Sequence, residues 1–92
     1  MRFQILRAAE RDIEKIIEYT DDNFGEAQTR EYLAGLYHSF DLLTDNPKMG
    51  MALDGMRRRY VYKSHYVYYR IDREILKILR IRHTSMKEPA RR

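Results

Sequence analysis

The sequence contains no cysteine and no long run of apolar residues, and each absence excludes a class of protein. Without cysteine there is no disulfide framework, which fits a reducing compartment. The apolar runs extend over only a few residues, too short to span a bilayer or to form the apolar stretch of a signal peptide. The three histidines lack the spacing of metal ligands, and no thiolate is available beside them. We therefore expect a cytoplasmic protein with no membrane contact, no metal and no cofactor.

Acidic residues are scarce in the second half of the chain, where lysine and arginine accumulate. Residues 1–46 hold 5 Lys/Arg and 10 Asp/Glu, a net charge of −5, whereas residues 47–92 hold 13 and 4, a net charge of +9. Such polarity favours a macromolecular partner over a small buried substrate. A chain of 92 residues has room for one hydrophobic core. We assign this domain to residues 1–86 and expect residues 87–92 to be a flexible basic tail.

Hydrophobic periodicity predicts a strand followed by two helices. Residues 3–6 are a short strand candidate, and apolar residues then recur at helical spacing over residues 9–24 and again over 33–43. Gly25 suits the turn between the two helices, and the Asn46-Pro47 pair ends the second one. The two helices should therefore form an antiparallel hairpin.

The period changes from 3.6 to 2 in the second half, which predicts strands. We interpret residues 47–55 as a loop, followed by strands at 58–62, 66–71 and 75–82 that are separated by short turns. These three strands should form an antiparallel meander. The sequence thus predicts an α+β fold of order β-α-α-β-β-β, with the helical hairpin on one face of the sheet and the other face open.

Alternation in the last strand decides which side chains face the open side. It places Leu79 and Ile81 in the core, and Arg80 and Arg82 on the open face. However, Leu76 and Ile78 share the register of Arg80. Either a bulge shifts the register within this strand, or the open face carries an apolar patch.

Arginine and tyrosine side chains on an open face would suit two kinds of partner. Nucleic acid would offer phosphates to the arginines and bases to the rings. An acidic protein segment would offer carboxylates and aliphatic side chains. The alternative is that these are ordinary residues of solvated strands, paired across the sheet. The candidate partner-binding residues are Arg57, Arg58, Tyr60, Tyr68, Arg70, Arg80, Arg82 and His83.

The remaining histidines and the methionines receive structural interpretations. His38 lies in the second helix and His65 in a turn, and we interpret both as structural or solvated. His83 fits a hydrogen-bonded structural role at the end of its strand. Methionines fill irregular gaps but also form soft interaction surfaces, and here we favour gap filling beside the helices. These methionines are Met49, Met51 and Met56.

Four segments carry a family pattern. They are LRAAERDI at 6–13, NPKMG at 46–50, GMRRRYVYKSHYVYYRI at 55–71 and ILRIRHTSM at 78–86. Their order and spacing resemble the ParE branch of the RelE/ParE toxins, which belong to bacterial type II toxin–antitoxin systems. The resemblance extends over about residues 3–86.

The resemblance implies a function as well as the same fold. It implies a ParD-like antitoxin with a ribbon–helix–helix start, encoded beside the toxin, whose C-terminal region wraps the toxin in a hetero-oligomer. For the ParE branch it implies poisoning of DNA gyrase and growth arrest through trapped DNA breaks. For the RelE branch it implies cleavage of mRNA on the ribosome. A degenerate, non-toxic binding module is a third possibility.

The chemistry of RNA cleavage helps to choose between these branches. Cleavage through the 2′-hydroxyl needs one group to accept a proton, another to donate one, and cations near the phosphate. His83 could serve as one such group, but Thr84 follows it and no tyrosine comes after. His83 with Met86 is similar to the ParE ending, although Lys87 stands where that branch usually has Asp. We therefore expect a non-enzymatic gyrase inhibitor without catalytic residues, with the RelE-type endoribonuclease as the alternative.

Overall fold

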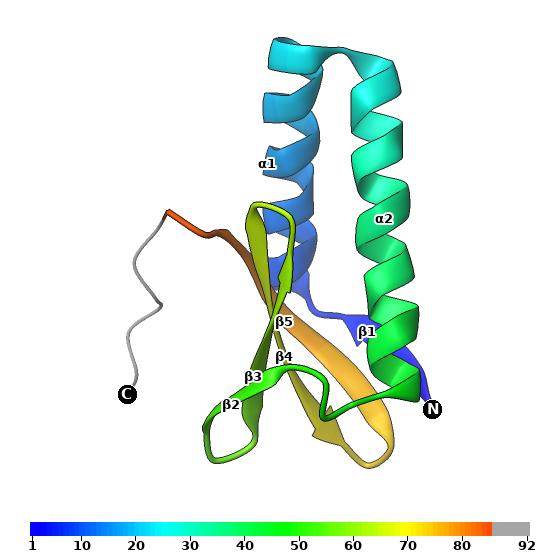
Figure 1. Cartoon of the computed structure of the whole chain (residues 1–92), viewed down its shortest axis with the longest axis vertical. Helices are drawn as coiled ribbons and strands as arrows, with labels where there is room; N and C mark the ends of the chain where they lie inside the picture. Colours follow the sequence, from blue (N-terminus) through cyan, green and yellow to red (C-terminus); the bar gives the residue numbers. More distant parts are fainter. Residues whose placement is uncertain (86–92) are drawn as a thin grey trace.

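A computed structural model describes residues 1–85, and in it a helical hairpin lies against one five-stranded sheet (Figure 1). The predicted tail at 87–92 lies outside the described residues. The observed element order confirms the predicted α+β fold, with one additional strand. The elements are β1 (Arg2–Ile5), α1 (Arg7–Phe24), α2 (Glu26–Asp45), β2 (Met51–Asp54), β3 (Arg57–Tyr62), β4 (His65–Asp72) and β5 (Ile75–His83).

The two helices meet and end where the local sequence predicts. Gly25 joins them with a φ of 89°, a backbone conformation that favours glycine, and its N–H donates to the carbonyl of Asp21 at 3.1 Å. At the end of α2, the N–H of Asn46 donates to the carbonyl of Leu42 at 2.9 Å, and Pro47 prevents continuation. Neither helix is long and apolar enough to cross a membrane in the part of the chain that the structure describes.

The sheet has the strand order β1-β5-β4-β3-β2. Strands β2 to β5 form an antiparallel meander, and β1 pairs with β5 in parallel. The interpretation of residues 47–55 as a loop is wrong for Met51–Asp54, which pair with β3. Such a short strand shows no clear alternation, so its structure depends on the neighbouring strand. β1 pairs with β5 only as far as Ile78, which leaves the second half of that edge without a strand beside it among residues 1–85.

A bulge in β5 resolves the conflict of register in the last strand. Tyr68 pairs with Arg80 and Tyr69 pairs with Ile78, so that Leu79 is the extra residue. The bulge alternative is therefore confirmed, and the assignment of Leu79 to the core is wrong because this side chain stays half-buried. The buried side chains of this strand are Leu76, Ile78 and Ile81.

The core lies between the hairpin and the inner face of the sheet. Tyr69 is fully buried there, and its hydroxyl donates to the carbonyl of Pro47 at 2.7 Å and accepts from the N–H of Gly50 at 2.9 Å. This anchors the segment after α2 to the sheet. A side chain at residue 50 would collide with that hydroxyl. The core cluster comprises Ala9, Ile13, Ile16, Leu36, Phe40, Leu43, Val67, Tyr69, Leu76, Ile78 and Ile81.

Candidate functional site

A groove with a volume of about 740 Å³ lies where α1 borders the second half of β5. His65 at the start of β4 and Tyr32 in the first half of α2 complete its walls. On the α1 side, Ile16, Tyr19 and Phe24 give apolar surface, with Asp12, Lys15 and Thr20 beside them. The β5 side is rich in nitrogen groups, including Arg82 and His83. The groove therefore combines apolar surface with basic side chains.

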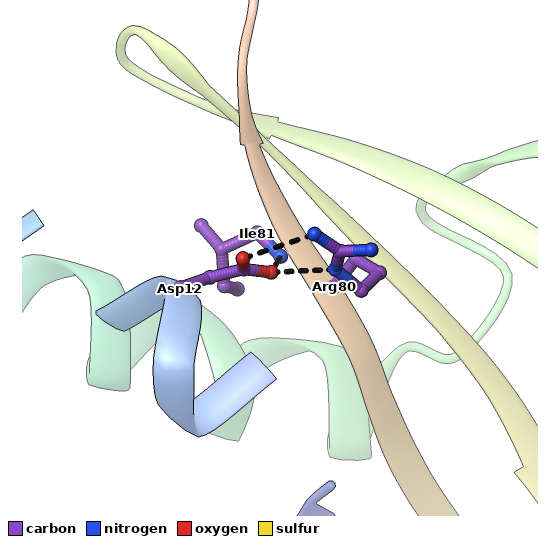
Figure 2. A network of polar contacts seen from close by, with 3 residues as sticks. All are labelled: Asp12, Arg80 and Ile81. Carbon is purple, nitrogen blue, oxygen red and sulfur yellow. Dashed lines mark hydrogen bonds and ion pairs between the residues drawn. The ribbon is translucent and has the colours of Figure 1, made fainter. Parts of the chain in front are cut away.

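An ion pair joins α1 to β5 at the border of this groove (Figure 2). The carboxylate of Asp12 accepts from Nε and Nη2 of Arg80 at 2.8 and 3.1 Å. It also accepts from the backbone N–H of Ile81 at 2.8 Å, which satisfies a donor on the edge of β5 beyond the end of β1. The hydrogen bond that Arg80 donates to Asp12 raises the pKa of Arg80 above its ordinary value. Arg80 is thus held by a carboxylate of the acidic first half, while its side chain remains partly exposed.

Two histidines pack against each other in the groove. His65 and His83 are cross-strand partners, with ring centroids 5.3 Å apart in an edge-to-face arrangement. Nδ1 of His65 lies 2.6 Å from the hydroxyl of Tyr32, and Nδ1 of His83 accepts from the N–H of Ser85 at 3.1 Å. His65 therefore belongs to β4 and not to the predicted turn. The hydrogen-bonded role predicted for His83 is confirmed.

Burial keeps His65 uncharged. Loss of hydration lowers its pKa from the usual 6.5 to about 4, the proximity of His83 acts in the same direction, and Asp12 opposes the shift. An imidazole with this pKa is neutral at physiological pH. Each of the two rings also has its Nδ1 within hydrogen-bonding distance of a hydroxyl group of the chain. The sequence alone did not predict that a second imidazole lies beside His83, because the pairing of His65 with His83 depends on the register between β4 and β5.

Several of the predicted open-face residues do lie on the outer face of the sheet. Cross-strand pairing puts Arg57 opposite Arg70 there, and Tyr68 opposite Arg80. Arg57 binds Asp54 through Nε and Nη2 at 3.1 and 2.9 Å, and a nitrogen of Arg70 lies 3.5 Å from Asp72. Asp54 and Asp72 thus neutralise much of the positive charge of these two arginines.

Tyrosine rings cover part of the outer face. Tyr68 is only 2% exposed, although it points away from the core. The guanidinium of Arg59 lies 4.1 Å from the ring centroid of Tyr66, which is a cation–π contact. This face is therefore packed by its own side chains, as in the predicted alternative of ordinary cross-strand pairs.

Two predicted candidates point toward the helices. Arg58 pairs with Tyr69 and Tyr60 pairs with Val67, and both partners are core residues. Arg58 donates through Nη1 to the carbonyl of Gly50 at 2.6 Å, so it supports the segment after α2. Alternation along β3 separates it from its two arginine neighbours. Of the two candidates Arg57 and Arg58, Arg57 therefore lies on the outer face and Arg58 on the inner face.

Arg82 and three methionines complete the candidate surface. Arg82 lines the groove, and its Nε is buried with no hydrogen-bond partner within residues 1–85. The prediction that the methionines fill gaps beside the helices is wrong, because all three are exposed. No cluster of metal-binding side chains is found within the described part of the chain. The three methionines are Met49, Met51 and Met56.

Comparisons with known proteins place this chain in a family. The family model described as ParE toxin of type II toxin-antitoxin system, parDE, matches residues 3–88. Toxin ParE1 of Mycobacterium tuberculosis is 33% identical in an alignment of 89 residues that covers 92% of this chain and 91% of that protein. Toxin ParE1 of Caulobacter vibrioides is 29% identical in an alignment of 91 residues that covers 96% of this chain and 94% of that protein.

A solved structure shares the fold. It is the chromosomal ParDE TA system from P. aeruginosa, with a TM-score of 0.81 and 17% sequence identity, and the match covers 92% of this chain and 97% of the other. The resemblance noted in the sequence is confirmed by these matches. The chain belongs to the ParE toxin family of type II toxin–antitoxin systems.

Proposed function

We propose that this chain is a non-enzymatic toxin of the bacterial cytoplasm that inhibits DNA gyrase. A ParD-like antitoxin would neutralise it in a hetero-oligomeric complex. Family membership over residues 3–88 supports the role as a toxin. The similar structure from P. aeruginosa is of a ParDE system, which supports an antitoxin as the partner.

The observation that carries antitoxin binding is the groove with its exposed aromatic wall. Tyr19 and Phe24 of α1 are 63% and 64% exposed, and their ring centroids lie 6.4 Å apart. Exposed aromatic rings beside cations are typical of surfaces that bind another protein. An amphipathic antitoxin segment would place apolar side chains on these rings and an acidic side chain toward β5.

Antitoxin binding is tested by adding a charge to this wall. Phe24→Asp should weaken binding of the antitoxin encoded beside the toxin by at least roughly 10-fold, because a carboxylate would replace an apolar contact. Val61→Asp is the matched control, since Val61 is 53% exposed on the other side of the sheet. Titration calorimetry measures both affinities. Equal losses in the two variants, or none in Phe24→Asp, would place the antitoxin elsewhere.

Gyrase inhibition is tested with purified components. Toxin added to gyrase and relaxed plasmid should prevent supercoiling or accumulate cleaved DNA, and prior addition of the antitoxin should prevent both effects. Gyrase of normal activity at micromolar toxin would contradict this part of the proposal. Antitoxin binding would stand unaffected by that result.

One observation favours the ribonuclease alternative. His65 and His83 lie with ring centroids 5.3 Å apart, so a second imidazole stands near the one predicted to take part in proton transfer. Our proposal excludes catalysis because the neutral His65 and its contact with Tyr32 fit a packed, structural pair. mRNA fragmentation in a translating extract, abolished by His83→Gln, would support the ribonuclease instead.

A further inference from the structure

Arg82 carries a buried donor that no other residue within 1–85 satisfies. Its Nε is shielded from solvent and meets no acceptor there. The side chain lines the groove beside α1, where it neighbours His83 in the sequence. A buried N–H on a charged group is costly to leave without an acceptor, because it loses its hydrogen bonds to water and gains none. The position of this atom therefore points to an acceptor from another molecule.

In two other arginines of the sheet, the edge of the guanidinium formed by Nε and Nη2 binds a carboxylate. Arg80, two residues earlier on β5, binds both oxygens of Asp12 through Nε and Nη2. Arg57 on β3 binds Asp54 through the same two nitrogens. This edge matches the spacing of the two carboxylate oxygens, so both bonds form together. Arg82 has the same chemistry, and its Nε has no carboxylate from residues 1–85.

We infer that the Arg82 side chain turns its Nε edge into the groove when a partner polypeptide binds, and that it anchors one carboxylate of that partner there. The inference rests on the antitoxin binding proposed above and adds the chemistry by which the groove recognises that partner. Apolar side chains next to the carboxylate would lie on Ile16, Tyr19 and Phe24 of α1. The occupant is therefore an antitoxin segment in which a single Asp or Glu stands among apolar residues.

The apolar surface of the groove favours a peptide over a nucleic acid. The charged side chains that line it are Asp12, which Arg80 already binds, and the basic residues Lys15, Arg80 and Arg82. Ile16, Tyr19 and Phe24 offer aliphatic and aromatic surface, which the apolar side chains of an amphipathic segment cover and phosphates do not. A segment with one carboxylate places its charge at the guanidinium and its apolar side chains against this surface.

The first test compares Arg82→Met with Arg73→Met in the full toxin. Both replacements remove one positive charge, and Arg73 is exposed in the turn between β4 and β5. Titration with the full antitoxin from the adjacent reading frame should show binding weakened roughly 10- to 100-fold by Arg82→Met and changed less than twofold by Arg73→Met. The thermal midpoint of free Arg82→Met should stay the same or rise, because an unsatisfied donor is removed. A lowered midpoint with unchanged affinity would indicate a structural role and overturn the inference.

The second test identifies the carboxylate without changing the toxin. Each Asp or Glu in the toxin-binding part of the antitoxin is replaced by its amide, and each variant is titrated into wild-type and Arg82→Met toxin. One replacement should weaken binding to wild type strongly and have little further effect on Arg82→Met, which is the signature of a direct pair. In isotope-labelled wild-type toxin, the Nε–H resonance of Arg82 should move downfield with the antitoxin and stay in place with that one variant.

The outcomes separate this inference from the proposed function. An antitoxin that binds, with none of its acidic residues coupled to Arg82, overturns the inference and leaves antitoxin binding intact. Wild-type toxin that binds no antitoxin overturns the proposed partner itself. A short DNA duplex that moves the Arg82 Nε–H resonance, where the antitoxin does not, overturns the assignment to a peptide.

Discussion

Acid should weaken this fold through His65. The folded protein holds this imidazole neutral, with a pKa of about 4, because it is half-buried beside His83. In the unfolded chain the same group has its usual pKa of 6.5. As the pH falls below 6.5, the unfolded chain binds a proton that the folded protein does not bind until about pH 4. The stability is therefore full above the unfolded pKa and declines between the two values.

The size of the effect follows from the difference between the two pKa values. Each pKa unit corresponds to about 1.4 kcal/mol, so the shift of His65 limits the loss to about 3 kcal/mol. We expect roughly 1 to 3 kcal/mol, because water enters partly buried sites as they become charged. The hydroxyl of Tyr32 lies 2.6 Å from Nδ1 and holds the ring in place within the groove.

The assay is urea unfolding followed by circular dichroism at about pH 7 and about pH 4.5. His65→Gln keeps an oxygen that can accept from Tyr32 and removes the titration. Between the two pH values, the free energy of unfolding of this variant should fall by roughly 1 to 3 kcal/mol less than that of wild type. The carboxylates lower the stability equally in the two proteins and cancel in this comparison. His38→Gln, at an exposed site on α2, should follow wild type. If His65→Gln and wild type lose the same free energy of unfolding, the argument from burial fails.

Two further predictions concern buried polar contacts, and urea unfolding at neutral pH tests both. Asp12→Ala should lower the free energy of unfolding by about 2 to 4 kcal/mol, since it removes the partner of Arg80 and of the Ile81 N–H, whereas Asp12→Asn should lower it less. Equal losses in these two variants would contradict a role for the oxygen acceptor. Tyr69→Phe should cost about 1 to 3 kcal/mol by leaving the buried Gly50 N–H without its acceptor, and a loss near zero would refute that pairing.

Local signals predicted the helical half of the fold. A glycine at position 25 and the Asn46-Pro47 pair each act within one turn of the helices they end, so no distant residue was needed. β2 was not predicted because Met51–Asp54 form a strand only by pairing with β3. The bulge was one of two alternatives suggested by the conflicting register of β5. Its location at Leu79 followed only from the pairing with β4.

The candidate site was harder to predict because its contacts cross the chain. Asp12 and Arg80 are 68 residues apart, and no local pattern couples them. His65 and His83 meet through the register of two strands, and a one-residue shift would separate them to opposite faces. Arg58 is the opposite case, because the local alternation of β3 was enough to predict that its side chain lies on the inner face. It was included among the open-face candidates because of its charge.

The contrast between an acidic first half and a basic second half has a different meaning in the folded protein. Some of the opposite charges pair within the fold. Asp12 of α1 binds Arg80 of β5, and Asp54 and Asp72 neutralise arginines of the sheet. A count of basic residues therefore overestimates the charge that a partner meets. Arg82 differs because its Nε is buried without an acceptor from residues 1–85 and its side chain lines a groove with apolar surface. Because a buried charge favours the partner that can pair with it, we expect recognition to depend on the position of this guanidinium more than on the total charge.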